Sequence, residues 1–130
     1  MKKLIVIVSV FAVLLAAMIC EMVFVNDYYS KLQSDLETVK KSIDLHEENV
    51  DNETTIALCE DVAKKWEEGK NWLLLIQNHN TVRNFDDKIV SLVEVVKSGN
   101  YNDAVIFINS AINYIDDVLL DSMPFATNIL

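Results

Sequence analysis

One apolar block near the N-terminus constrains this chain more than any other feature. Residues 4–25 are interrupted only by Ser9 and Glu21, and Lys2 and Lys3 precede them. As a helix, these 22 residues rise about 33 Å, enough to cross a bilayer core of about 30 Å. A backbone inside lipid must satisfy its own hydrogen bonds, so the block can only be helical there. We therefore predict a membrane anchor over residues 1–25.

A cleaved secretory signal is the alternative for this segment, and a lipoprotein signal ending at Cys20 is a second one. Secretory signals have an apolar core of about 7–15 residues and a small-residue cleavage site, whereas the run here extends over residues 4–20. The small pair Ala16-Ala17 lies inside that run, and bulky residues precede Cys20. We expect an uncleaved signal-anchor in the cell membrane. The two lysines place its N-terminus in the cytoplasm and the rest of the chain outside.

The charge of the remaining segment, residues 26–130, restricts its partners. After residue 25 the chain has 9 basic and 19 acidic residues, which gives a net charge of −10. Nucleic-acid binding needs a basic surface, so no nucleic-acid partner is expected. The same charge disfavours electrostatic adhesion of this acidic segment to anionic lipid headgroups.

The scarcity of turn residues defines the fold class. Two glycines and one proline in the whole chain are too few for an all-β protein and suit long helices. Hydrophobic periodicity predicts helices over about 4–45, 53–78 and 84–98, and a fourth between Asn100 and Pro124. We predict an all-α fold in which an N-terminal transmembrane helix continues into a four-helix antiparallel bundle of two helical hairpins. The short apolar tail, residues 123–130, is expected to be docked and not free.

The apolar faces of these segments predict the core. The first segment continues from the membrane as a narrow seam with alternating spacings of three and four, and the others carry stripes on one side. The predicted core positions are Tyr29, Leu32, Leu36, Val39 and Ile43; Ile56, Cys59, Ala63, Trp66, Leu73 and Ile76; Ile89, Leu92, Val93 and Val96; and Ala104, Ile108, Ala111, Ile115 and Val118. Gly69, in the middle of the second helix, indicates a kink or the close approach of another helix.

Capping residues mark the ends of several helices. Asp51 or Asn52 can cap the second helix, and Asn100 can cap the fourth. Gly99 can take the left-handed conformation that ends the third helix.

The segment Asn78-His79-Asn80 is the most distinctive local feature. Asn78 and Asn80 favour a turn. At the end of the second helix, the His79 side chain can donate to carbonyl groups that lack a helical partner. We expect His79 to cap this helix and to contribute about 1 kcal/mol to stability. A binding contact is the alternative.

The sequence contains no recognisable set of catalytic residues or metal ligands. His46 has no companion at metal-ligand spacing, and His79 would need Asp86 or Asp87 plus a remote ligand. The two cysteines indicate no disulfide framework, and Cys59 fits a buried apolar position or an environment that is not strongly oxidising. Adjacent acids such as Asp86-Asp87 fit the solvated faces of helices. We expect no enzymatic activity, no metal and no cofactor.

Two further sites have alternative interpretations. Glu21 lies inside the apolar block, where carboxylates are candidates for function. It either reaches water near the outer membrane face or pairs with a polar group of another membrane protein. Trp66 and Trp72 fit positions in the core or at the edge of the bundle, and a ligand cage is the alternative for both.

Several segments together resemble a known family. They are the "MKKLIV" anchor, "AKKWEEGKNWLLLIQNHN", the acidic residues that open the third helix, and the ending "PFATNIL". Over almost the whole chain they resemble the domain-of-unknown-function family 4363, small single-pass membrane proteins of low-GC Gram-positive bacteria. The positions that match are Trp66, His79, Asn80, Pro124 and Asn128. The chain departs from the family pattern near residues 82–83, where it lacks an acidic residue. The resemblance implies a YetF-type membrane protein as a neighbour.

These features lead to a functional expectation. We expect a membrane-anchored helical interaction module that binds or supports another membrane protein, and an extracytoplasmic small-ligand sensor or binding bundle is the alternative. The expected partners are the lipid bilayer and another membrane protein. The candidate partner contacts are Glu21, Trp66, Trp72, His79, Asn80 and Asn128.

Overall fold

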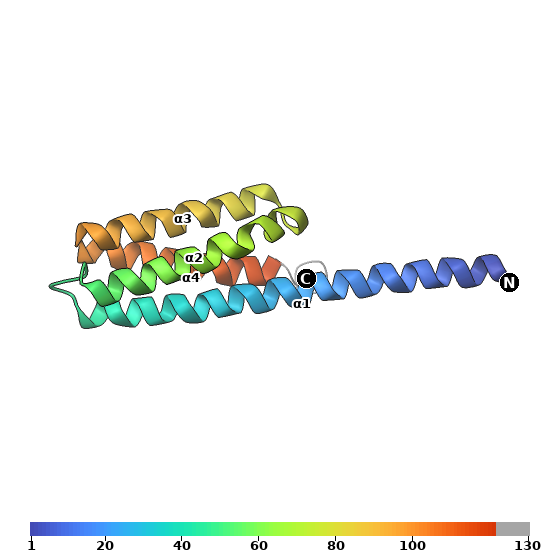
Figure 1. Cartoon of the computed structure of the whole chain (residues 1–130), viewed down its shortest axis with the longest axis horizontal. Helices are drawn as coiled ribbons and strands as arrows, with labels where there is room; N and C mark the ends of the chain where they lie inside the picture. The colour runs from blue at the N-terminus through green and yellow to red at the C-terminus, as the bar shows by residue number, and fades with distance from the viewer. Residues whose placement is uncertain (122–130) are drawn as a thin grey trace.

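The fold is a bundle of antiparallel helices with one long extension. The computed structural model describes residues 1–121. In that range it has four α-helices, α1 (Lys2–Leu45), α2 (Glu53–Ile76), α3 (His79–Ser98) and α4 (Tyr101–Asp121). α1 and α3 each pack against both α2 and α4, so the helices form a closed ring of two hairpins (Figure 1). The predicted all-α bundle, with α1 continuing into it from the apolar block, is confirmed.

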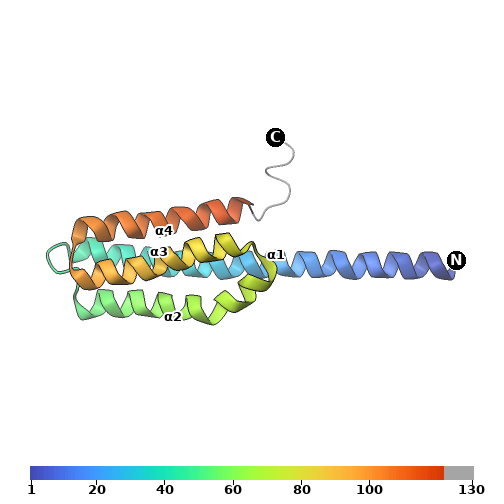
Figure 2. The same ribbon diagram turned by 90° about the horizontal axis from the view of Figure 1, so that it is seen from above.

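α1 is the longest helix and only its C-terminal half belongs to the bundle. The N-terminal half projects alone beyond the other helices (Figure 2). Within residues 1–121, α1 is the one helix that is long and apolar enough to cross a membrane, and the apolar window in it has no buried residue. This assignment of α1 as a possible membrane-spanning helix rests on its length and composition, which a signal sequence near the N-terminus shares. No break separates the projecting half from the bundle half, so the two parts are joined rigidly.

The core confirms most of the predicted stripes. The five seam residues of α1, from Tyr29 to Ile43, are all buried. The stripes of α3 and α4 are buried as well, except that Val93 is half-buried. α3 also contributes Val82, which lies before the expected start of that helix, and Phe85, which lies just after it. Among the described residues, no buried side-chain nitrogen or oxygen lacks a hydrogen-bond partner.

The buried face of α2 is rotated from the predicted one. The stripe follows a seven-residue repeat that includes a polar residue and a glycine, and it consists of Thr55, Cys59, Val62, Trp66, Gly69 and Leu73. Thr55 is tolerated there because its hydroxyl lies 2.6 Å from the Ser42 hydroxyl of α1. Ile76, which was expected in the core, is exposed. The prediction for Ile76 is wrong because α2 ends at this residue.

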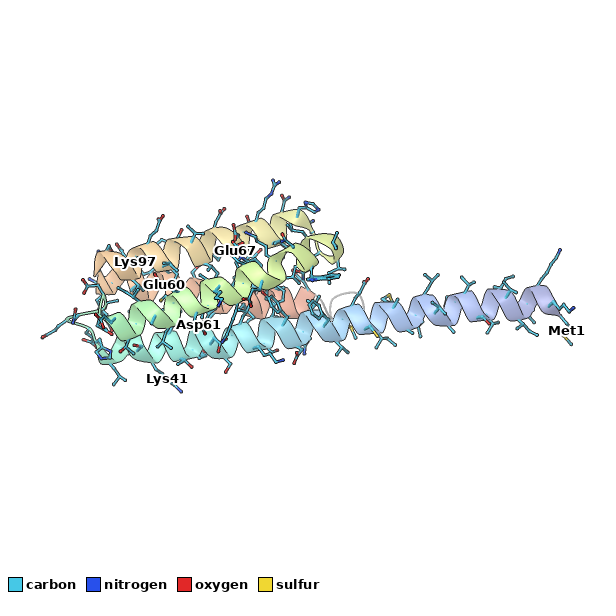
Figure 3. All side chains as sticks on the ribbon, in the orientation of Figure 1. Met1, Lys41, Glu60, Asp61, Glu67 and Lys97 are labelled. Carbon is cyan, nitrogen blue, oxygen red and sulfur yellow. The ribbon has the colours of Figure 1, made fainter. Side chains whose placement is uncertain are left out.

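The end of the bundle farthest from the projecting half is held by caps and an ion pair. The Asn52 side chain accepts a hydrogen bond from the Thr55 amide at 3.0 Å, and the Asn100 side chain accepts one from the Asp103 amide at 3.1 Å. Gly99 is left-handed, with φ of 76°. These three predicted helix ends are confirmed. Lys97 pairs with Glu60 at 2.8 Å and joins α3 to α2 (Figure 3).

The buried thiol of Cys59 makes the fold sensitive to alkali. Burial raises the pKa of Cys59 from 9.0 to about 12. A raised pKa in the folded state gives stability that is complete below pH 9 and is lost as the pH rises toward 12. We expect the free energy of unfolding to fall by about 1 kcal/mol between pH 8 and pH 10 from Cys59. Urea unfolding at pH 8 and at pH 10, followed by circular dichroism, measures this fall in the free energy of unfolding.

The matched control for this prediction is Cys59→Ala. Burial also raises the pKa values of the phenols of Tyr28 and Tyr29, so the variant should keep a pH dependence that begins nearer pH 10. A variant whose stability declines as much as that of the natural chain between pH 8 and pH 10 would contradict the role of the thiol.

Candidate functional site

The half of the bundle that faces the projecting helix is built on an aromatic cluster. It contains Tyr28 and Tyr29 of α1, Trp66 of α2, Phe85 of α3 and Tyr114 of α4. The Trp66 and Phe85 ring centres lie 4.7 Å apart and nearly perpendicular, and Phe85 stacks on Tyr114 at 6.0 Å. Edge-to-face and offset pairs of this kind add to the stabilisation from burial. The cluster therefore fixes all four helices at the end nearest the apolar extension.

Asp86 completes this cluster by satisfying the indole of Trp66. The Trp66 side chain is 1% exposed, and its Nε1–H donates to Asp86 Oδ1 at 2.7 Å. Lys70 Nζ lies 3.2 Å from the same oxygen and 2.6 Å from Glu67. The adjacent Asp87 is exposed. The prediction that both acids lie on a solvated face is therefore wrong for Asp86. Its carboxylate links α3 to Trp66 and Lys70 of α2.

Asp86→Ala is expected to lower the free energy of unfolding by about 1–2 kcal/mol, because it leaves a buried indole N–H without an acceptor. Asp87→Ala is the matched control and should change stability by less than about 0.5 kcal/mol. Thermal or urea unfolding of the two variants in the same detergent gives the comparison. Equal stability of the two would mean that the Trp66–Asp86 bond contributes nothing.

Tyr28 and Gly69 form a close contact between α1 and α2. The Tyr28 hydroxyl lies 2.7 Å from the Lys65 carbonyl and 3.1 Å from the Trp66 carbonyl, to which it donates. A Cβ added at Gly69 would overlap the Tyr28 ring. The glycine therefore marks the close approach of another helix, one of the two predicted alternatives. Outside this contact lies an open groove of about 340 Å³ that Phe24, Tyr28 and Trp72 help to line.

The α2–α3 corner differs from its prediction. α2 ends at Ile76, and the Asn78 side chain accepts a hydrogen bond from the Asn80 amide at 2.8 Å. His79 is thus the first residue of α3 and not a cap of α2, so both that role and a third helix beginning near Asn84 are wrong. The reason is that Asn78 caps α3 directly, which leaves no loop of several residues. Within the described chain, the exposed His79 side chain makes no hydrogen bond or ion pair.

Two tyrosines hold this corner against the bundle. The Tyr29 hydroxyl donates to the Gln77 side chain at 2.9 Å, and the Tyr114 hydroxyl donates to the Thr81 carbonyl at 3.0 Å. The corner is therefore fixed to α1 on one side and to α4 on the other. Sequence reasoning placed Tyr29 in the core but gave no role to Gln77, Thr81 or Tyr114.

The structure brings most of the candidate partner contacts to one end of the bundle, the end from which α1 projects (Figure 1). Trp72, His79 and Asn80 are exposed at or near the α2–α3 corner, and Glu21 lines an open hollow together with Ile76, Gln77 and Asp121. Trp66 is buried in the core and presents no surface to a partner. Asn128, Pro124 and the apolar tail lie outside the described residues. No group of three or more His, Cys, Asp or Glu among residues 1–121 is placed to hold a metal ion.

Comparison with known proteins gives a family match. Residues 22–129 match the family described as "Domain of unknown function (DUF4363)". Neither the search of curated proteins nor the search of solved structures finds a match. The matched segment includes the bundle half of α1 together with α2, α3 and α4.

Proposed function

The chain belongs to the DUF4363 family, and we propose that it is a membrane-anchored helical module that binds or supports another membrane protein. In this proposal the N-terminal half of α1 crosses the cell membrane with Lys2 and Lys3 in the cytoplasm. The bundle lies on the outer side. The partner is recognised by contact and undergoes no reaction, and the YetF-type neighbour that the family resemblance implies is the first partner to test.

The observation that carries this proposal is the unbroken course of α1. The same helix is the exposed apolar segment and a core helix of the bundle. Its seam residues are buried against the other helices, so the bundle cannot pivot freely on a flexible linker. A rigid connection holds the α2–α3 corner at a fixed height beside the bilayer. A partner that meets this corner must therefore itself be at the membrane.

The polar residues of the corner are the proposed contact. His79 and Asn80 are exposed at the start of α3, and among residues 1–121 no side chain bonds the His79 ring. The structure supports the corner through Gln77 and Thr81 rather than through His79. Because the exposed His79 ring makes no contact that supports the fold within the described part of the chain, it is available to bind a partner.

Site-specific photo-crosslinking in native membranes tests the proposal. A photoreactive residue at Asn80 should capture a membrane protein, whereas one at Asp51, in the loop at the opposite end, should not. His79→Ala should weaken the capture and change the stability by less than about 0.5 kcal/mol. Capture at Asp51 and Asn80 alike, or the absence of any membrane protein from the Asn80 product, would defeat the proposal.

The topology has its own test. Glu48→Cys in a Cys20→Ser background places one exposed thiol at the far end of the bundle, while Cys59 stays buried. A membrane-impermeant maleimide added to intact cells should label this variant and should leave the parent without Glu48→Cys unlabelled. Labelling that occurs only after lysis would put the bundle in the cytoplasm.

The alternative function, an extracytoplasmic small-ligand sensor or binding bundle, needs an enclosed cavity near Gly69. The Tyr28 ring lies over Gly69, and the groove beside it is open to solvent. Ligand sites are usually concave and bury most of the ligand surface. The geometry near Gly69 therefore supports the interaction module better.

A further inference from the structure

Exposed apolar side chains gather at the end of the bundle from which α1 projects. Trp72 is 66% exposed, Leu75 76% and Leu120 56%, and Ile76 is exposed beside them in sequence. These four residues are called the apolar rim below. They belong to the last turns of α2 and α4, and both helices end where the projecting half of α1 begins (Figures 1 and 2). In water this rim would be an unfavourable surface.

The length of α1 places the rim at the level of the bilayer. Ile76, Gln77 and Asp121 line one hollow with Met18 and Glu21, so the bundle already lies beside α1 from Met18 onward. The apolar segment that is clear of the bundle, residues 4–17, has 14 residues and rises about 21 Å. A bilayer core of about 30 Å needs about 20 helical residues, which would extend to residue 23. The end of the bundle must therefore reach the lipid boundary.

We propose that the apolar rim inserts into the boundary between headgroups and acyl chains of the bilayer that α1 crosses. This inference rests on the proposed membrane anchoring. The bundle then contacts the lipid surface directly and does not stand above it. Trp72 suits this place because its indole has an apolar body and a polar N–H, and tryptophan is enriched at membrane interfaces.

The chemistry of the helix ends limits how deeply the rim enters. The Asn78 side chain satisfies the Asn80 amide, but other carbonyl groups at the end of α2 and amides at the start of α3 have no partner within their helices and need water or lipid headgroups. They can lie among headgroups but not in the hydrocarbon core. The acidic segment also disfavours attraction to anionic lipid, and Glu21 and Asp121 lie at this end. Insertion should therefore depend on apolar contact and should occur in zwitterionic lipid.

Depth-dependent fluorescence quenching tests the proposal with the full chain in phosphatidylcholine vesicles. The Trp72 signal is the difference between the natural chain and Trp72→Phe, because both contain the buried Trp66. Interfacial side chains lie about 5–10 Å into the boundary, so we expect bromines near the headgroup to quench Trp72 roughly twice as strongly as bromines near the chain ends. Aqueous iodide should quench it little.

A pair of substitutions tests whether the rim is responsible. Leu75→Glu should remove the preference for shallow bromines, whereas Ile106→Glu should keep it, because Ile106 is similarly exposed but lies toward the opposite end of the bundle. Circular dichroism checks that both variants are folded. If Leu75→Glu behaves like Ile106→Glu, the rim is not inserted.

The remaining outcomes separate this inference from the anchoring on which it rests. Vesicle flotation reports the anchor, and a chain that does not float overturns both proposals. If the chain floats but Trp72 is quenched by iodide and by neither brominated lipid, the shallow nor the deep one, only the insertion proposal is overturned. Protection of Trp72 from iodide and from both lipids, with a doubled mass in crosslinking, would show that a second copy covers the rim and would also overturn insertion.

Discussion

Replacing Trp66 with alanine is expected to lower the free energy of unfolding by about 3–5 kcal/mol, the usual range for a buried tryptophan. Trp66 is 1% exposed and contacts the rings of Tyr28, Tyr29 and Phe85. Its removal leaves a cavity between α2, α1 and α3 that the surrounding rings cannot easily close. Urea unfolding in detergent, followed by circular dichroism, measures the loss.

The matched variant is Trp72→Ala, six positions further along α2. Trp72 is 66% exposed, so its replacement should change the stability in detergent by less than about 0.5 kcal/mol. If the two tryptophan variants lose similar stability, then Trp72 is packed in solution and the apolar rim is not a free surface. A Trp66→Ala chain as stable as the natural one would contradict the role of the aromatic cluster in holding the helices together.

Gly69→Ala is expected to destabilise the fold by about 2–3 kcal/mol, although alanine is the better helix former by about 1 kcal/mol. The new methyl group would overlap the Tyr28 ring. The ring must then move, and its hydroxyl loses the carbonyls of Lys65 and Trp66. The same urea titration measures this loss.

A double variant isolates the cause of that loss. In a Tyr28→Ala background the space above Gly69 is empty, so Gly69→Ala should cost less than about 0.5 kcal/mol or should stabilise the helix. If Gly69→Ala costs the same with and without the Tyr28 ring, the glycine serves another purpose, such as a bend in α2.

Much of the fold could be predicted because most helices carry continuous one-sided patterns. The seam from Tyr29 to Ile43 and the stripe from Ala104 to Val118 have apolar residues at helical spacing, and both are buried. Asn52, Gly99 and Asn100 act through their own local geometry, and each ends or begins a helix as predicted. Local signals of this kind do not depend on what lies across the bundle.

The predictions that failed concern positions whose role depends on another helix. Thr55 gave no apolar signal, yet it is buried because the Ser42 hydroxyl of α1 meets its own hydroxyl. Asp86 looks like its neighbour Asp87 in the sequence, and only the indole of Trp66 distinguishes it. His79 looked like a helix cap, but the chain turns within Gln77 and Asn78 and leaves its ring without a partner in the described part of the molecule.

From the sequence one can derive an apolar segment long enough to cross a membrane, an all-α class, a net acidic charge and the buried stripes of α1, α3 and α4. Hydrophobic periodicity and scarce turn residues are properties of each segment, so they can be recognised before the chain is folded. Only packing of the whole chain fixed where α3 begins and that the end of the bundle lies beside Met18. These features depend on how each helix is rotated and on how high it sits relative to its neighbours. Contacts between residues distant in sequence, such as Tyr28 with Gly69, set this rotation and height.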